Sequence, residues 1–136
     1  MLATAGLSLP ILMLVFGWYR SLYAPGVYKC WLLGGLLLAA AFGYCYARPL
    51  RYPGTSISAG LLVPFTLVAA FGLVNQLSKR LNGRPFIFPN RLTITPAERV
   101  AINASDLVGY GLIMLSSYGM FFYWSVRISK HLPALL

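Results

Sequence analysis

The chain has 136 residues, of which 59% are hydrophobic and only 10% are charged. Soluble domains average about 45–50% apolar and about 25% charged residues, so this composition excludes an ordinary soluble globular protein. The formal net charge is +9. The basic residues are spread beside apolar runs instead of gathering in one folded module, so we expect no nucleic-acid partner.

Four long apolar runs indicate an all-α integral membrane protein with four transmembrane helices. A helix needs about 20 apolar residues to cross the hydrocarbon core, and in lipid the backbone must satisfy its own hydrogen bonds. We predict helices at about 2–19, 30–47, 57–77 and 97–127 within a single polytopic domain, 1–136. A basic connection of about 25–30 residues joins the third and fourth helices, and its loop covers 78–96.

The first run is expected to be a retained helix. A cleaved signal peptide begins with a basic region, whereas no Lys or Arg precedes Arg20. Trp18 and Tyr19 at its end are typical of aromatic side chains at the headgroup level. Pro10 and Pro64 are expected to kink the first and third helices, because proline removes a backbone hydrogen bond.

Small residues recur at every fourth position of the second helix, and a looser series occurs in the fourth. Such spacing lets another helix approach closely. Two interpretations remain open, namely packing within the bundle and contact with a foreign helix. The predicted packing or partner face consists of Gly35, Ala39, Gly43, Ala47, Gly111 and Gly119.

The loop at 78–96 begins at the stop signal Asn82–Gly83 and ends at a capping box, Thr95–Glu98, that starts the fourth helix. Between them, Pro85 and Pro89 disfavour helix. The three apolar residues that they enclose are too few to cross a membrane, so we expect them to lie among lipid headgroups or to dock into a partner. The candidates for recognition or lipid contact are Arg80, Arg84, Phe86, Phe88, Arg91, Arg99 and Asp106.

The start of the fourth helix carries most of the polar residues. Helical spacing places Arg99, Asn103 and Asp106 near one face, which indicates either a recognition site at the membrane surface or a solvated helix start. Basic residues at this level attract anionic lipid headgroups. We therefore expect anionic membrane lipids as partners.

The residues available for catalysis are few. Glu98 and Asp106 are the only carboxylates, and eight residues along one helix separate them by about 12 Å. His131 is the only histidine, and Cys30 and Cys45 lie at opposite ends of the second helix. We expect no enzyme activity, no metal and no cofactor.

The distribution of basic residues predicts the orientation. The first and third connections share one side of the membrane and carry seven Lys and Arg residues, against four on the other side. Because basic residues favour the cytoplasmic side, we expect loop 78–96 in the cytoplasm and both termini outside. The expected location is a bacterial inner membrane.

These features favour a protein that acts by helix–helix contact with another membrane protein, as an accessory subunit or an assembly or regulatory factor. The chain is similar in size, charge and hydropathy to the immunity proteins of pore-forming bacteriocins. That similarity implies the alternative of an immunity-type or exclusion protein. A small four-helix transporter or channel is a further alternative, although coupled transport usually needs an ionisable group within a span.

Overall fold

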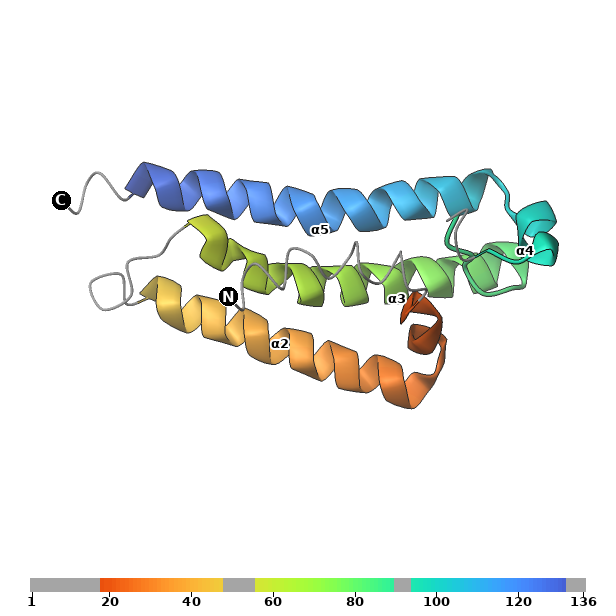
Figure 1. The fold of residues 1–136 in the computed structure, drawn as a ribbon, viewed down its shortest axis with the longest axis horizontal. Helices are drawn as coiled ribbons and strands as arrows, with labels where there is room; N and C mark the ends of the chain where they lie inside the picture. Colours follow the sequence, from red (N-terminus) through yellow and green to blue (C-terminus); the bar gives the residue numbers. More distant parts are fainter. Residues whose placement is uncertain (1–17, 48–55, 90–93, 132–136) are drawn as a thin grey trace.

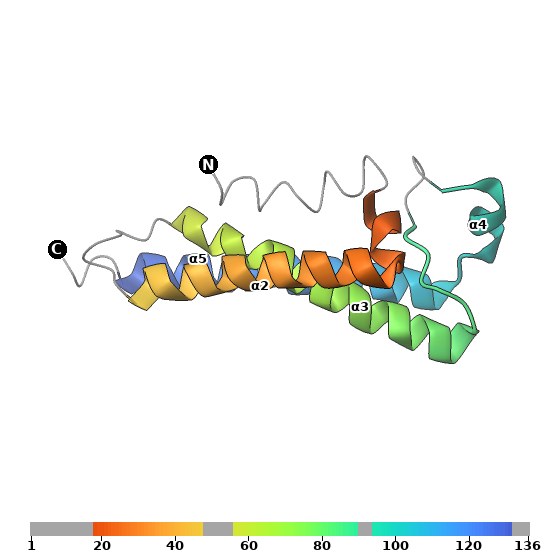
Figure 2. The ribbon, with the colours of Figure 1, turned by 90° about the horizontal axis from the view of Figure 1, so that it is seen from below.

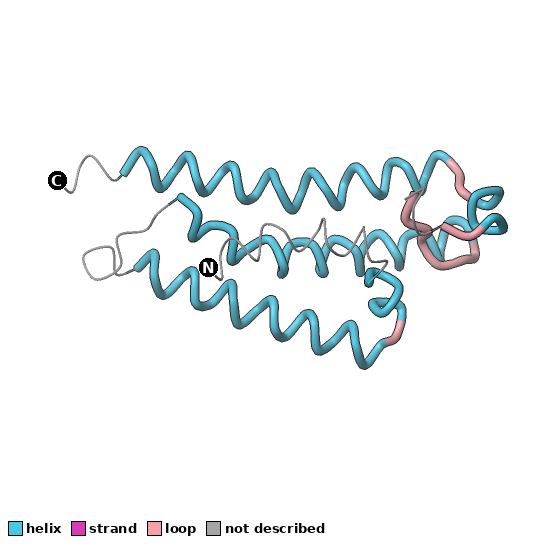
Figure 3. The backbone as a smooth tube through the Cα atoms, viewed as in Figure 1, coloured by secondary structure: helices cyan, strands magenta, loops and turns pink. Residues whose placement is uncertain are grey.

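The computed structural model describes residues 18–47, 56–89 and 94–131, and these ranges contain only helices and connecting segments (Figure 3). The predicted helix at 2–19 lies outside the described residues, apart from Trp18 and Tyr19 in the first 3-10 helix. In chain order the elements are η1 (Trp18–Tyr23), α2 (Pro25–Ala47), η2 (Ser56–Leu62), α3 (Val63–Asn82), α4 (Pro96–Ala101) and α5 (Ala104–His131).

Among the described residues, three helices are long and apolar enough to cross a membrane. The candidate spans are Pro25–Tyr44, Ala59–Asn82 and Ala104–Ile128, with 20, 24 and 25 residues. Their length and composition confirm the expectation of an all-helical membrane protein for the described residues.

The central helix of this arrangement is α3, which lies between α2 and α5 (Figures 1 and 2). It is the most buried of the three. Where α3 packs against α2, a Cβ added to Gly35 would lie 2.8 Å from the Cα atom of Phe65. Only glycine permits this distance, so one residue of the predicted small-residue face packs against α3.

The limits of α3 follow from proline and glycine. The 3-10 helix η2 changes into α3 at Val63, and Pro64 occupies the first turn, where no backbone N–H is needed. Pro64 therefore marks the junction of two helix types. The helix continues beyond the predicted end at residue 77 to Asn82, and Gly83 ends it with φ 65°, a left-handed conformation that glycine adopts readily.

The predicted helix at 97–127 is divided into α4 and α5. The capping box of Thr95 and Glu98 is present as expected at the start of α4. Ile102 is extended, with ψ 134°, and the Asn103 side chain accepts a hydrogen bond from the Asp106 N–H at 3.2 Å. Asparagine is a preferred N-cap because its side chain satisfies a free N–H, so a new helix begins here.

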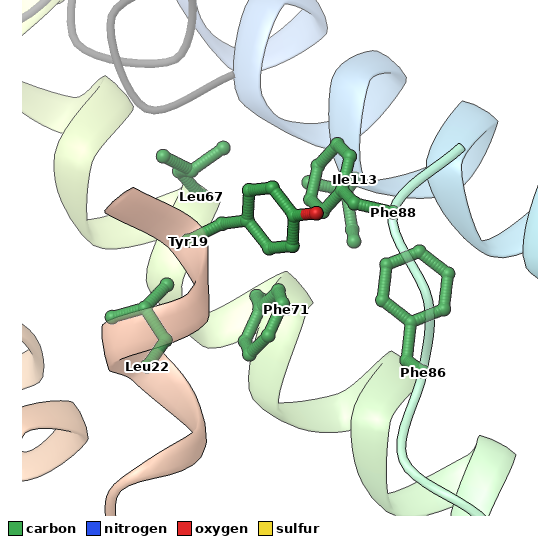
Figure 4. Close-up of a cluster of buried hydrophobic side chains, with 7 residues drawn as sticks. All are labelled: Tyr19, Leu22, Leu67, Phe71, Phe86, Phe88 and Ile113. Carbon is green, nitrogen blue, oxygen red and sulfur yellow. The ribbon is translucent and has the colours of Figure 1, made fainter. Parts of the chain in front are cut away.

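Two groups of buried side chains hold the helices together. The larger joins η1, α3, α5 and the connection after α3 (Figure 4). Its buried members are Tyr19, Leu22, Leu67, Phe71, Phe86, Phe88 and Ile113. A smaller group, Phe42, Ala59 and Ile128, joins α2, η2 and α5 at the other end of the bundle.

Candidate functional site

Polar groups from the loop and from α5 converge on Asp106, which is fully buried in the first turn of α5. Its Oδ2 atom lies 2.6 Å from Nη2 of Arg84, and it also accepts the Asn103 N–H at 3.1 Å. Its Oδ1 atom accepts the Ile87 N–H at 3.3 Å. We call Arg84, Asn103 and Asp106 the polar hub. Several donors thus offset the cost of burying this carboxylate.

Asp106 also fixes the start of α5. The side chain of Asn103 accepts from the backbone of Asp106, while the side chain of Asp106 accepts from the backbone of Asn103. This reciprocal pair has the geometry of a capping box. A negative charge near a helix N-terminus is favourable, because unpaired N–H groups gather there.

Arg84 links three segments through one guanidinium group. Besides its contact with Asp106, Nη2 donates to the carbonyl of Ala101 at 2.5 Å, at the end of α4. Nη1 donates to the carbonyl of Pro85 at 3.2 Å, within the loop. The side chain is 24% exposed. Arg84 therefore holds the loop, α4 and α5 in one arrangement.

A second set of hydrogen bonds joins the end of α3 to the start of α5. The Asn82 Nδ2 group donates to Ser105 Oγ at 2.8 Å and to Ser78 Oγ at 3.3 Å. Its Oδ1 atom accepts from Asn103 Nδ2 at 3.2 Å. Asn82, recognised in the sequence only as part of a stop signal, is thus also a tertiary contact.

The apolar part of the loop folds back into the bundle. Phe86 is fully buried and Phe88 is 3% exposed. The Phe86 N–H donates to Asn75 Oδ1 at 3.0 Å, and the Tyr23 hydroxyl donates to the Phe86 carbonyl. Burial raises the pKa of Tyr23, which keeps its hydroxyl protonated as a donor.

The position of these rings differs from the expected contact with headgroups or with a partner. The Phe88 ring lies 4.8 Å from that of Tyr19 and 5.4 Å from that of Tyr110, measured between centroids. Figure 4 shows Phe86 and Phe88 directed toward Phe71 and Ile113. A lipid or a partner would not reach rings enclosed in this way. The apolar residues pack inward because α3 and α5 leave space for them at this end.

An exposed ion pair connects η1 to α4. Arg20 Nη2 lies 2.7 Å from Glu98 Oε2, and the same oxygen accepts the Thr95 N–H at 2.8 Å. The hydrogen bond from the Thr95 backbone has the largest effect in lowering the pKa of Glu98, and the contact with Arg20 lowers it further. Glu98 thus joins the capping box of α4 to Arg20 of η1.

The predicted small-residue face is divided by the structure. A Cβ added to Gly43, Gly111 or Gly119 would have no atom within 4 Å, in contrast to Gly35. Ala39 is partly buried and Ala47 is exposed. These open glycines lie on α2 and α5, and no described residue fills the space beside them.

The remaining predicted contact residues are basic. Arg80 and Arg99 are both exposed, at the end of α3 and in α4, whereas Arg91 lies outside the described residues. The structure therefore brings together Arg84 and Asp106 and leaves Arg80 and Arg99 at the surface.

The hydrogen bonds of the polar hub hold the loop, α4 and α5 in place. Within residues 18–47, 56–89 and 94–131, no three His, Cys, Asp or Glu side chains lie close enough to hold a metal ion. Every buried side-chain nitrogen and oxygen in this part of the chain has a hydrogen-bond partner. These groups satisfy one another and fix the loop against α3 and α5.

Two contributors to this arrangement, Asn75 and Tyr23, were not predicted from the sequence. A polar residue such as Asn75 inside a candidate span is a signal of an internal partner, because an unpaired amide is costly in lipid. Tyr23 carries no such signal, since tyrosine is common at membrane interfaces in any case.

The chain matches no protein-family model, no curated protein and no solved structure. Its own contacts and exposed surfaces are therefore the basis for assigning a function.

Proposed function

We propose that this chain is a non-catalytic membrane protein that binds another membrane protein by direct helix–helix contact, as an accessory subunit or assembly factor of a membrane complex. The observation that carries the proposal is the open surface beside Gly43, in the α2 span, where an added Cβ would meet no atom of the described residues within 4 Å. Close approach of backbones at small residues is the usual basis of helix association in lipid.

The open glycines matter more than the exposed apolar side chains around them. Leu36 and Leu37 of α2 are more than half exposed, but any lipid-facing helix has such residues. Glycine gives lipid no side chain to pack against, and in a helix it costs about 1 kcal/mol relative to alanine. An open glycine within a span is therefore favourable where another backbone comes close.

Helix α2 contains one glycine that is packed against a neighbouring helix and another that is open. Gly35 is in contact with the backbone of α3, and Gly43, about two turns later, is open. The series of small residues thus begins at an internal interface and continues onto a surface that the described residues leave free. This continuity supports a second helix contact on α2.

We also propose that residues 2–19 form a fourth spanning helix, with both termini outside an inner membrane and the α4 end of the bundle in the cytoplasm. Arg20, Arg84 and Arg99 are gathered at that end, through η1, the loop and α4. An excess of basic residues beside the spans favours the cytoplasmic side.

The test is purification of the full-length chain in mild detergent at native expression, with mass spectrometry of the proteins that accompany it. We expect one stoichiometric membrane partner. Gly43→Leu should reduce its recovery about tenfold, equivalent to about 1.4 kcal/mol, because the leucine blocks the approaching helix. The abundance of the variant itself should not change.

Two glycines of the same helix provide matched controls. Gly34 also has open space beside it and lies nine residues from Gly43, on the opposite side of a helix with 3.6 residues per turn. Gly34→Leu should keep the partner. Gly35→Leu should lower abundance, because the side chain meets Phe65. A chain that is purified alone, or an equal effect of Gly34→Leu and Gly43→Leu, would contradict the proposal and would favour an immunity-type or transport role.

A further inference from the structure

A groove of about 300 Å³ lies between α3 and α5 at the end where the loop folds back. Its walls are almost entirely apolar, and residues that are more than half exposed face it from both helices. The lining includes Val74, Leu77 and Leu81 of α3 and Val108, Gly109 and Leu112 of α5.

The floor of the groove is set by tight packing. A Cβ added to Gly109 would lie 2.6 Å from Cγ1 of Val74 and 2.9 Å from Cε2 of Phe86. Asn82 and Ser105 connect the two helices where the groove reaches the end of α3. The groove is thus apolar along its length and polar at one end.

Two exposed basic side chains occur in the last turn of α3, between the groove residues Ser78 and Leu81 in the sequence. The chain has two Asp and Glu residues in total, and they pair with Arg20 and Arg84. Lys79 and Arg80, both exposed in the last turn of α3, form no ion pair within the described residues. Arg80 directly precedes the groove residue Leu81. Both side chains can therefore bind an anion from outside the chain.

We infer that the groove binds an anionic phospholipid, with one acyl chain between α3 and α5 and the phosphate beside Lys79 and Arg80. The apolar walls match the chain, and the cations at the end of the span match a headgroup phosphate. A volume near 300 Å³ is at the lower limit for ligand pockets. A groove of this size can hold a narrow alkyl chain, whereas a helix, with a diameter of about 10–12 Å, is too wide for it. This inference does not depend on the proposed protein partner.

The test uses the delipidated full-length chain in detergent and counts bound lipids by native mass spectrometry during titration with dioleoylphosphatidylglycerol or dioleoylphosphatidylcholine. We expect one tightly bound phosphatidylglycerol and weaker binding of phosphatidylcholine. Lys79→Gln with Arg80→Gln should weaken phosphatidylglycerol about 25-fold, since each basic residue near an anionic headgroup contributes about fivefold. The binding of phosphatidylcholine should not change.

Matched variants separate the groove from the general surface. Val108→Trp fills the groove and should remove binding of both lipids. Leu107→Trp is the control, because Leu107 is the neighbouring residue, is similarly exposed and does not line the groove. Lys29→Gln with Arg127→Gln removes the same charge at positions outside the groove and should retain the preference for phosphatidylglycerol.

Three results would overturn the inference. The first is equal affinity for the two lipids, and the second is unchanged binding by Val108→Trp. The third is displacement of phosphatidylglycerol by glycerol 3-phosphate at comparable concentration, because a free phosphate would then occupy the cationic site without using the groove. A loss of the protein partner in Gly43→Leu would leave each of these measurements unaffected.

Discussion

Asp106 is the residue on which the contacts between the loop and α5 converge. It accepts hydrogen bonds from Arg84 and from the N–H groups of Ile87 and Asn103. A buried ion pair adds little stability compared with a well-packed apolar pair, but removal of one partner leaves a charge without compensation. The value of Asp106 therefore lies in fixing which segments meet.

Asp106→Ala is expected to lower the free energy of unfolding by about 3–5 kcal/mol, because the Arg84 guanidinium and two backbone N–H groups lose their acceptor. Unfolding in detergent, titrated with sodium dodecyl sulfate and followed by circular dichroism, measures this quantity. Arg20→Ala is the control, since it removes an exposed pair whose contribution is about 1 kcal/mol at most and keeps the capping box of Thr95 and Glu98. Equal losses in the two variants would show that burial of Asp106 has no special effect.

The Arg20–Glu98 pair should respond to acid. The pKa of Glu98 is below its usual value of 4.5, so the ionised carboxylate stabilises the folded state. This contribution is complete above the unfolded value and is lost as the pH falls through the folded value. We expect faster hydrogen exchange of the α4 amides, after correction for the intrinsic rate, at pH 3 than at pH 6. Glu98→Gln should abolish the difference, and a difference that persists in this variant would assign it to another group.

The connection after α3 is an element of the core although it has no regular secondary structure. Phe88 contributes most directly, with its ring in contact with Tyr19, Phe71 and Tyr110. Pro85 and Pro89 at the two ends restrict the segment to extended conformations. The stiff segment holds its aromatic side chains in the space between η1, α3 and α5.

Phe88→Ala is expected to lower the free energy of unfolding by about 3–5 kcal/mol, because it leaves a cavity among rigid neighbours. The variant should also accumulate to a lower level in the membrane. Phe122→Ala is the matched change at a ring that is 63% exposed, and it should stay within about 0.5 kcal/mol of the parent. If Phe88→Ala keeps full abundance and stability but no longer recovers the membrane partner, the ring acts in recognition and not in the core.

The capping box that starts α4 and the stop signal that ends α3 are visible in the sequence because both signals are local. Thr95 and Glu98 are three residues apart, and Asn82–Gly83 ends α3 by its own conformational preference. The break at Asn103 is harder to predict, because the helical pattern of α4 and α5 continues through it. There a side-chain hydrogen bond competes with the helix backbone, and the pattern of apolar residues does not reveal which one prevails.

The inward packing of the loop depends on contacts that no local pattern contains. Arg84 and Asp106 are 22 residues apart, and Phe86 and Asn75 are 11 apart. A run of basic, proline and aromatic residues is equally compatible with lipid, with a partner or with the chain's own core. Only the space left between α3 and α5 selects among these environments. The fold class was therefore accessible from composition, and the arrangement of the candidate site was not.

At the scale of the whole molecule, the bundle has two different ends. The start of α2, the end of α3 and the start of α5 lie together with η1 and α4 (Figure 1). The end of α2 and the end of α5 meet through Phe42 and Trp124, whose centroids are 5.5 Å apart. Helices that cross a membrane in this arrangement place these two groups on opposite sides.

Single cysteines provide a test of this arrangement, after replacement of Cys30 and Cys45. Cysteines at Ala24 and Val100, both exposed at the η1 and α4 end, should be protected from an impermeant thiol reagent in intact cells. A cysteine at Ala47, at the other end of α2, should be labelled. All three should be labelled after the cells are opened. If only one of the cysteines at Ala24 and Val100 is labelled in intact cells, the arrangement of the bundle is wrong. If both are labelled and the cysteine at Ala47 is protected, the arrangement stands and only the orientation in the membrane is inverted. The two outcomes differ because packing places Ala24 and Val100 on one side, while the distribution of arginines determines which side it is.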